Sequence, residues 1–359
     1  MPGIDVRKEM PGAELTREQF SQRMQQQFAD PAFDNIRSDV ERIIEAAWQG
    51  YSNHRKSPHT RPAGDGYADP KYELAVEWID ASRRIKEAER RQKDPASASR
   101  ILLINGAARS EHTCPGETSK TWRLATFARE VFDQEQGLEV DLLDLSRLTS
   151  EYGRHIHPCK TCVSTAMPLC HWPCSCYPNY SLGQVQDWMN DIYPMWAAAH
   201  GIMIVTPVNW YHSSSVLKLM IDRLVCADGG NPDPTSTKGK NPKLAKTLEL
   251  DGWHYPRHLA GRVFSVVAHG DATGVHGLQT SLASWLNDMG LIEAGHRSQI
   301  ETYIGYMEPY ATSHQALDKD TAVQDETRNA ARSLIQAVKQ LRSGDLKQPD
   351  KGLRDPRPK

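Results

Sequence analysis

The sequence has no long hydrophobic run and almost no net charge. None of its apolar stretches approaches the roughly 20 residues that span a bilayer, although 39% of its 359 residues are hydrophobic. Lys and Arg number 43 and Asp and Glu 45, which leaves a net charge of −2. This balance gives no general attraction to nucleic acid or to an anionic membrane surface. The N-terminal segment also lacks the apolar stretch of a signal peptide, so we expect a cytoplasmic protein with no nucleic-acid or membrane partner.

Cysteine is concentrated in one short segment. Five of the seven cysteines fall within 18 residues, at Cys159, Cys162, Cys170, Cys174 and Cys176. In a reducing compartment, such spacing indicates metal or redox chemistry before disulfides. The thiols are candidate ligands of an iron–sulfur cluster or of a structural zinc ion. A third interpretation has no metal, and the thiols then pack in a core or form a redox pair.

The N-terminal quarter differs in composition from the rest of the chain. Residues 1–97 are polar and rich in helix formers, with amphipathic helices expected over 21–29, 36–48 and 72–91. Residues 54–70 are interrupted by Pro and Gly. No catalytic pattern appears here, so we expect a helical extension that packs on the core or on a second subunit.

Residues 98–343 alternate short apolar runs with helical patterns, which predicts a doubly wound α/β domain with a parallel sheet. Two inserts interrupt the domain, a Cys-rich one at 151–180 and a polar one at 228–258, and a tail expected to be disordered follows at 344–359. Ligands of such sheets bind beyond the carboxyl ends of the strands. The strands are expected at residues 101–104, 139–145, 202–205, 263–268 and 299–304, with helices at 119–132, 183–200, 214–225, 278–289 and 318–342.

The loop after the first strand has the composition of a phosphate site. It begins at Gly106 and carries Arg109 and Ser110 before a helix that opens with Ser119-Lys120-Thr121. Backbone N–H groups at a helix start, with hydroxyls and a guanidinium beside them, suit a phosphate. An ordinary polar loop with a serine cap is the alternative. A nucleotide-binding P-loop does not match, because Ser119 stands where that motif requires Gly.

Two loops together resemble a known family, the flavodoxin-like NAD(P)H-dependent FMN reductases and quinone reductases. Gly106-Ala-Ala-Arg109 is similar to the family's Gly-Ser-x-Arg loop, with Ala107 in place of the serine, and Ser119-Lys-Thr121 matches its Ser-x-Thr pair. The segment TPVNWYHSSSVLKLMIDRL at 206–224 resembles the loop that borders the flavin ring, followed by Leu-Lys-x-x-x-Asp-Arg. Around Cys114-Pro115 the chain carries an insertion that the family lacks.

The resemblance implies a flavodoxin-like sheet of five parallel strands in the order 2-1-3-4-5. It also implies bound FMN, NAD(P)H as the co-substrate and a homodimer or homotetramer. A flat, partly apolar slot would hold the flavin ring. Tyr211 and His269 are the candidates for proton supply. The residues expected to bind FMN are Ala107, Arg109, Ser110, Ser119, Lys120, Thr121, Pro207, Val208, Asn209, Trp210, Tyr211, His269, Gly270 and Asp271.

The function that follows is an FMN-dependent oxidoreductase that takes hydride from NAD(P)H and reduces a quinone, a flavin or another small acceptor. Iron–sulfur flavoproteins are similar in placing cysteines after the second strand, but seven residues separate Cys162 from Cys170 here, and the family spacing is tighter. A non-enzymatic electron-transfer protein, with flavin and with or without an iron–sulfur cluster, is the alternative. A regulatory flavoprotein without turnover is a third. The length and near-neutral charge of the chain favour the enzyme.

Overall fold

Short apolar runs form the central sheet of the structure, a computed structural model that describes residues 4–347. All four residues from Ile101 to Ile104 have no exposed surface, as expected for a parallel strand covered on both faces. The sheet belongs to a compact unit that, among the described residues, comprises 85–152, 191–221 and 257–347. Its strands are β3 (Ser99–Asn105), β4 (Leu138–Asp144), β5 (Gly201–Asn209), β6 (His212–Ser213), β7 (Val263–Gly270), β8 (Ile292–Glu293) and β9 (Gln299–Tyr303).

The strand order confirms the predicted flavodoxin-like topology. The parallel strands follow the order β4-β3-β5-β7, and both β8 and β9 pair with β7 in parallel. Two short strands therefore share the fifth position. With the strands numbered by the prediction, this is the order 2-1-3-4-5. The order reverses between β3 and β5, and in such sheets the ligand crevice lies outside the carboxyl ends at that point.

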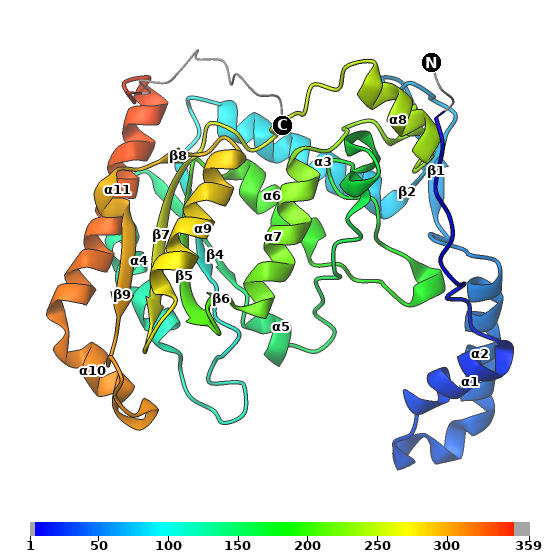
Figure 1. Cartoon of the computed structure of the whole chain (residues 1–359), viewed down its shortest axis with the longest axis horizontal. Helices are drawn as coiled ribbons and strands as arrows, with labels where there is room; N and C mark the ends of the chain where they lie inside the picture. The colour runs from blue at the N-terminus through cyan, green and yellow to red at the C-terminus, as the bar shows by residue number, and fades with distance from the viewer. Residues whose placement is uncertain (1–3, 348–359) are drawn as a thin grey trace. The chain divides into compact units, whose positions relative to one another are not determined.

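Helices cover both faces of the sheet (Figure 1). On one face α4 and α11 pack together and contribute side chains such as Leu124, Phe132 and Leu334 to the same apolar core as the strands. Helix α9 contacts β7 and lies on the other face in Figure 1. The helices that follow the strands are α4 (Lys120–Asp133), α5 (Arg147–Ser150), α6 (Met189–Ala198), α7 (Ser215–Asp228), α9 (Val275–Asp288), α10 (Ser313–Lys319) and α11 (Thr321–Ser343).

The N-terminal segment, the Cys-rich segment and the polar insert belong to a second compact unit. It comprises residues 4–84 together with 153–190 and 222–256. On the N-terminal helices, Phe20 packs against Trp48 and Tyr51. The elements of this part are α1 (Arg17–Gln26), α2 (Arg37–Ser52), β1 (Thr60–Pro62), β2 (Glu73–Ala75), α3 (Val76–Lys93), which continues into the first unit, and α8 (Pro242–Leu250).

Several local expectations need correction. Residues 60–75, expected as an irregular segment and a helix start, form the antiparallel ribbon β1–β2. The polar insert contains a helix, α8, which Asn241 caps by accepting from two backbone N–H groups. The expected helix at 318–342 corresponds to α11, which Asp320 caps, but a separate short helix, α10, precedes it. The predicted disordered tail lies mostly outside the described residues, which end at 347.

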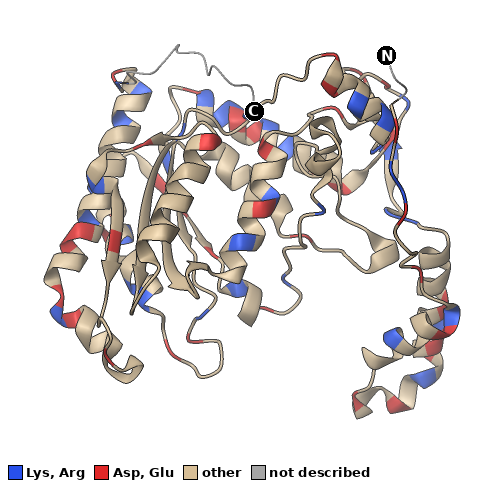
Figure 2. Cartoon of the chain, in the orientation of Figure 1, with Lys and Arg blue, Asp and Glu red and all other residues tan. Residues whose placement is uncertain are grey.

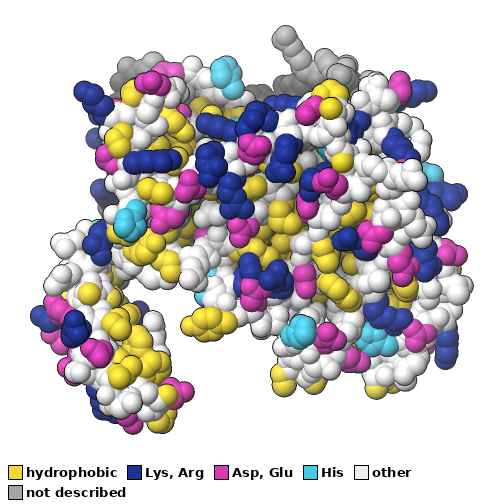
Figure 3. Space-filling view, turned by 180° about the vertical axis from the view of Figure 1, so that it is seen from behind, with side chains coloured by type: hydrophobic (Ala, Val, Ile, Leu, Met, Phe, Trp, Pro, Cys, Tyr) yellow, Lys and Arg dark blue, Asp and Glu magenta, His cyan; other side chains and the backbone are white. Residues whose placement is uncertain are grey.

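Charged residues of both signs are interspersed over the helices, whereas the strands of the sheet carry few (Figure 2). The face seen in Figure 3 likewise mixes basic and acidic side chains, with hydrophobic ones between them. This mixture agrees with the net charge of −2. Among residues 4–347, no helix combines the length and the hydrophobicity needed to cross a membrane.

Candidate functional site

The loop after β3 and the carboxyl ends of β5 and β7 meet at one cavity of about 430 Å³ at the carboxyl edge of the sheet. This volume falls within the range of small-molecule sites, roughly 300 to 1,000 Å³. The cavity lies within one compact unit. Eleven of the fourteen residues expected to bind FMN line it: Ala107, Arg109, Ser119, Lys120, Thr121, Pro207, Val208, Asn209, His269, Gly270 and Asp271.

The start of α4 forms one wall of the cavity. Ser119 has extended backbone angles and its Oγ accepts a hydrogen bond from the N–H of Trp122, so it is the N-cap. The first N–H groups of an α-helix have no partner within the helix. Those of Lys120 and Thr121 therefore stand at a position where the helix dipole favours an anion.

Two side-chain contacts join the start of α4 to the end of β7. The ammonium of Lys120 forms an ion pair with Asp271. The Nε2 of His269 lies 2.8 Å from the Oγ1 of Thr121. The Lys120 side chain is only 11% exposed, so this pair is shielded from solvent better than an ordinary surface ion pair. Together these contacts fix the loop after the fourth long strand against the phosphate-type loop after the first.

His269 is buried and neutral at physiological pH. Burial and, to a smaller extent, the charge of Lys120 lower the pKa of His269 to about 3. Its Nδ1 is buried and has no hydrogen-bond partner among the described residues. A buried polar atom without a partner costs about 1–3 kcal/mol. The cavity thus contains an unsatisfied donor or acceptor that a polar ligand atom would satisfy.

Glycine keeps the backbone of β7 close to β5 beside the cavity. A Cβ at Gly270 would lie 2.5 Å from Cγ1 of Val208 and 2.8 Å from Cγ2 of Val275. Both distances are far below ordinary van der Waals contact, so no larger residue fits without movement. At Gly106, a Cβ would lie 2.8 Å from Oγ1 of Thr206. These two glycines therefore allow the close packing of the backbone beside the cavity.

Residues 206–213, expected as a loop, form a β-hairpin instead. Strand β5 continues to Asn209, and β6 pairs back so that Asn209 faces His212. Trp210 and Tyr211 are the two turn residues, with φ values of 48° and 72°. A two-residue turn with both φ values positive belongs to type I′, which normally takes Asn and Gly. The turn does not line the cavity, and Trp210 is 93% exposed.

Ser110 also lies outside the main cavity. It lines a neighbouring cavity of about 150 Å³ together with Arg109, Ser119 and the end of β4. Arg109 lines both cavities, and its guanidinium donates to the carbonyl of Pro115 at 2.8 Å. The insertion around Cys114-Pro115 thus positions the arginine of the loop.

The sequence did not indicate several residues that line these cavities. Asn105 and Asp144 end β3 and β4, and the amide of Asn105 donates to Asp144 at 2.7 Å. Their places at strand ends were the signal that could have identified them. The others are Ala108, Glu111, His112, Glu117, Thr118, Trp122, Tyr310, Ser313 and His314, of which the last three follow β9 without any recognisable motif.

The Cys-rich segment lies in the other unit and carries its own polar contacts. The Sγ atoms of Cys162 and Cys176 are 3.5 Å apart, and Nζ of Lys240 lies 3.3 Å from Sγ of Cys162. The hydrogen bond from Cys176 and the charge of Lys240 help to lower the pKa of Cys162 to about 6. Among residues 4–347, no three His, Cys, Asp or Glu side chains are grouped to hold a metal ion. The metal site expected at the five cysteines therefore stays a prediction.

A comparison with models of protein families matches residues 99–301 to NADPH-dependent FMN reductases. The chain belongs to this family. It is therefore an NAD(P)H-dependent FMN oxidoreductase, as the resemblance of its loops predicted. The matched range begins at β3 and ends within β9, so this FMN reductase carries its N-terminal extension outside the family core.

The residues present fit the cofactor of an FMN reductase. A helix start with free N–H groups and a lysine suits a phosphate. The buried Nδ1 of His269, which has no partner among the described residues, could bind a polar ligand atom. A comparison with curated protein sequences gave no match.

Three solved structures are distantly similar to this reductase. RosB with a bound 8-demethyl-8-formylriboflavin-5'-phosphate intermediate is 14% identical, with a TM-score of 0.49 over 69% of this chain and 82% of RosB. An azoreductase from Bacillus anthracis str. Sterne is 14% identical, with a TM-score of 0.36 over 65% and 98% of the two chains. The apo form of the NADH:FMN oxidoreductase EMOB is 13% identical, with a TM-score of 0.34 over 70% and 92%.

Proposed function

We propose that this reductase holds FMN in the cavity at the carboxyl edge of its sheet, takes hydride from NAD(P)H and reduces a quinone, a free flavin or another small acceptor. One observation carries the assignment to this place: the carboxyl ends of three neighbouring parallel strands, with the loop after β3, line a single cavity of about 430 Å³. Strand β3 supplies a loop suited to phosphate, and β5 and β7 supply the opposite walls.

The phosphate of FMN is assigned to the start of α4. The N–H groups of the first helical turn would donate to it, and the hydroxyls of Ser119 and Thr121 lie beside them. Lys120 and Arg109 supply positive charge at the same wall. Ala107 leaves the backbone before them free of a bulky side chain, and Ser110 faces the smaller neighbouring cavity.

The isoalloxazine ring is assigned to the side formed by β5 and β7. Pro207, Val208 and Asn209 present backbone groups and apolar surface there, and Gly270 lets the two strands approach closely. The exposed turn residues Trp210 and Tyr211 would border the outer edge of the ring, where aromatic side chains can cover it from solvent. Asp271 contributes through its ion pair with Lys120.

FMN supplies the hydride chemistry when it is bound, and the protein supplies position and electrostatics. Tyr211 remains our assignment for proton supply, whereas His269, the other candidate, is assigned a hydrogen-bonding role. With a pKa of about 3, His269 is uncharged at neutral pH, so it would act as a neutral hydrogen-bonding group whose Nδ1 meets the ligand. Tyr211 is 62% exposed, so its side chain is open to solvent.

Anaerobic addition of NADH or NADPH to the FMN-loaded protein tests the proposal. We expect the flavin absorbance to bleach, and to return when a quinone is added. A protein that binds FMN but leaves NADH and NADPH unoxidised would instead be the electron carrier of the alternative interpretation. A protein that stays colourless and does not bind added FMN contradicts the proposal altogether.

Lys120→Met tests the place of the phosphate. Loss of one charge-assisted contact would raise the Kd for FMN about tenfold, the equivalent of about 1.4 kcal/mol. Lys339→Met is a matched control, because Lys339 lies on α11 and pairs with Glu135, and neither residue lines the cavity. We expect the Kd of this variant for FMN to be unchanged. Equal affinities in both variants would place the phosphate elsewhere.

A homodimer or homotetramer is also part of the proposal. Trp210, Tyr306 and Tyr310 are all more than half exposed on the unit that holds the cavity, and exposed apolar side chains of this size often contact partners. Analytical ultracentrifugation of the loaded protein checks this point. A monomer at all concentrations would rule it out.

A further inference from the structure

A second cavity, of about 560 Å³, lies within the unit that holds the Cys-rich segment. Its volume falls within the range of small-molecule sites, roughly 300 to 1,000 Å³. It shares no lining residue with the candidate flavin cavity. Three separate stretches of the chain form its walls: residues 55–78, residues 171–178 of the Cys-rich segment and residues 234–240 of the polar insert.

Hydrogen bonds join these stretches to one another. Nε1 of Trp78 donates to the carbonyl of Pro173 at 2.8 Å, which ties the first stretch to the Cys-rich segment. The N–H of Asp69 donates to Oγ1 of Thr235 at 3.0 Å, which ties it to the polar insert. Because the walls are fixed in this way, a ligand would enter a cavity that is already formed and would lose less free energy to ordering it.

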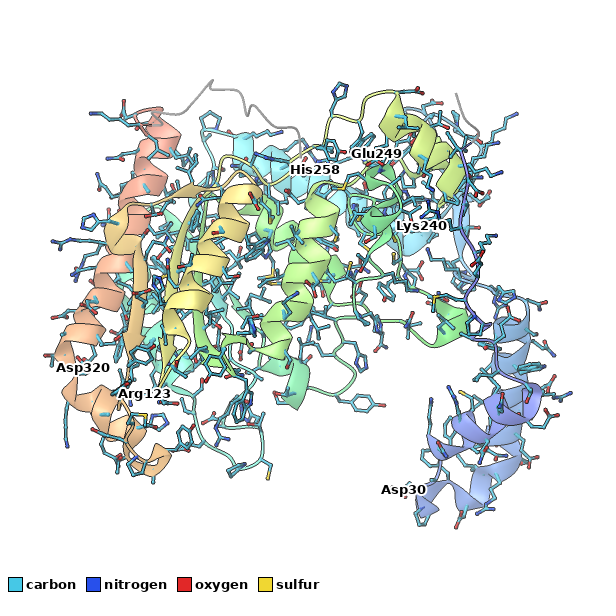
Figure 4. The ribbon with its side chains drawn as sticks, in the orientation of Figure 1. Asp30, Arg123, Lys240, Glu249, His258 and Asp320 are labelled. Carbon is cyan, nitrogen blue, oxygen red and sulfur yellow. The ribbon has the colours of Figure 1, made fainter. Side chains whose placement is uncertain are left out.

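Basic side chains outnumber acidic ones in the cavity wall. Arg55, Lys56 and Lys240 line the cavity against one carboxylate, that of Glu73. Arg55 and Lys56 are exposed, whereas Lys240 is half-buried. Lys240, labelled in Figure 4, lies just before α8. The cavity therefore has an excess of positive charge that a small anion can reach from solvent.

The two lysines keep donors that their present contacts do not use. Nζ of Lys56 donates to the carbonyl of Ser175. Nζ of Lys240 donates to the carbonyl of Leu169 at 3.0 Å and lies 3.3 Å from Sγ of Cys162. Among residues 4–347, neither ammonium forms an ion pair with a carboxylate. An ammonium has three N–H donors, so each lysine has at least one left for an anionic ligand.

The buried histidine of the wall is not available to a ligand. His171 lines the cavity and has no exposed surface. Its Nδ1 is hydrogen-bonded to Oγ of Ser175, and its Nε2 lies 3.2 Å from Oγ1 of Thr237. Both ring nitrogens thus have partners within the protein. The charged groups that remain for binding are the two ammonium groups and the guanidinium.

The rest of the wall is largely aromatic. Tyr72, Trp78 and Tyr177 line the cavity, and the last two are only 3% and 2% exposed. Nε1 of Trp78 is bonded to the carbonyl of Pro173, and the hydroxyl of Tyr177 donates to the carbonyl of Pro158 at 2.6 Å. The polar atoms of both rings are therefore occupied, and the rings offer apolar surface. Such surface favours a flat, unsaturated ligand.

We propose that this cavity is a second ligand site, which binds a small aromatic dicarboxylate. The ring system packs against the aromatic wall, and the carboxylates pair with Lys240 and with the exposed cations Arg55 and Lys56. Three basic residues against one acidic residue match a ligand with two negative charges. None of the five clustered cysteines is among the lining residues, so the proposal depends neither on a metal nor on the flavin and goes beyond the reductase activity.

Isothermal titration calorimetry of the full-length protein tests the proposal, with naphthalene-2,6-dicarboxylate as the probe. We expect one molecule to bind per chain. Naphthalene-2,6-dimethanol keeps the rings without the charges, and cyclohexane-1,4-dicarboxylate keeps the charges without the rings. Each should bind with a Kd at least about tenfold higher than the probe. Equal affinity for the diol would overturn the charge recognition, and equal affinity for the cyclohexane compound would overturn the aromatic recognition.

Charge variants locate the carboxylates of the probe. Lys240→Gln removes one charge-assisted contact and should raise the Kd for the probe about tenfold. Lys56→Gln should raise it as well, and because Lys56 is exposed, this variant separates binding from any effect of Lys240 on the fold. Lys71→Gln is the matched control, since Lys71 is exposed in the same unit and does not line the cavity. Equal affinities in all three variants would overturn the proposal.

An aromatic variant locates the ring system. Tyr72→Leu should weaken binding of the naphthalene probe and leave binding of cyclohexane-1,4-dicarboxylate unchanged, because only the first loses an aromatic contact. Tyr255→Leu is the control: Tyr255 belongs to the same unit and does not line the cavity, so both affinities should stay as in the wild type. Equal weakening of both ligands in Tyr72→Leu would overturn the place of the rings.

A further variant distinguishes this site from the candidate flavin cavity. Lys120→Met changes the flavin cavity alone, so the Kd for the probe should equal that of the wild type. A Kd that rises in Lys120→Met, but not in Lys240→Gln or Lys56→Gln, would place the probe in the flavin cavity and overturn the second site. A protein that circular dichroism shows to be folded, yet that binds no probe, would overturn it as well.

Discussion

The Nε2 of His269, at the end of β7, lies 2.8 Å from the Oγ1 of Thr121 in the first turn of α4. Both side chains are buried, with exposures of 3% and 1%. The contact joins two strand–helix units that are 148 residues apart in the sequence. It leaves Nδ1 of His269 as the one unsatisfied polar atom of that ring. The state of this histidine therefore links the stability of the fold to the candidate flavin site.

Thr121→Val removes that hydrogen bond while nearly keeping the side-chain shape. Both nitrogens of His269 would then be buried without a partner, which costs about 1–3 kcal/mol of the free energy of unfolding. Urea unfolding of the protein without flavin measures this loss in the free energy of unfolding. Thr126→Val on the same helix is the control, because Thr126 is exposed and bonds only to the carbonyl of Trp122; its effect should stay within about 0.5 kcal/mol. Equal losses would show that His269 does not need this partner.

Acid should destabilise the protein through His269. The pKa of this residue is about 3 in the folded state and about 6.5 in an unfolded chain. Between these values the unfolded state binds more protons, so stability falls as the pH falls, by about 1.4 kcal/mol per pH unit from this residue. His269→Asn removes that contribution. The free energies of unfolding of the wild type and the variant, measured between pH 7 and pH 5, should converge as the pH is lowered; parallel curves would contradict the assignment.

The sequence predicted the sheet because its signal is local and strong. Strands β3, β5 and β7 each contain a buried apolar run, and the carboxyl ends of such strands carry the ligand loops in a doubly wound sheet. Ser119-Lys120-Thr121 and His269-Gly270-Asp271 could therefore be assigned to one cleft without knowledge of their contacts. The ion pair between Lys120 and Asp271 could not, because nothing in either segment indicates its partner.

The hairpin and the second unit escaped prediction for different physical reasons. Trp210 and Tyr211 are poor turn formers by composition, and only the pairing of β5 with β6 forces them into positive φ. The second unit combines three chain segments, each separated from the next by more than 30 residues. Contacts between such distant segments leave no periodic pattern in the sequence. The proximity of Cys162 to Lys240, 78 residues away, depends on that arrangement.

Gly270→Ala should destabilise the fold and displace the residues that line the cavity. The added Cβ would overlap with Val208 and Val275, and overpacking of this kind costs about 1–3 kcal/mol. Because Gly270 and Val208 line the cavity, affinity for FMN should fall as well. Gly277→Ala is the matched control on α9, because Gly277 is exposed and an added Cβ would meet nothing within 4 Å. Alanine in a helix is more stable than glycine by about 0.5–1 kcal/mol, so the free energy of unfolding of this variant should rise. Thermal unfolding and flavin fluorescence titration measure both; a neutral Gly270→Ala would disprove the tight packing.

Trp210→Gly should separate stability from function. Glycine adopts the positive φ of this turn without strain, and strain at such a position costs about 1–3 kcal/mol, so the free energy of unfolding should rise by about 1 kcal/mol. If the exposed indole borders the flavin ring, as we propose, the same variant should turn over NAD(P)H more slowly. Trp210→Phe keeps an aromatic ring and the strained backbone, so we expect near-wild-type turnover with no gain in stability. A glycine variant that gains stability and keeps full turnover would show that the aromatic turn has no role at the flavin, and the residues lining the cavity itself would then suffice.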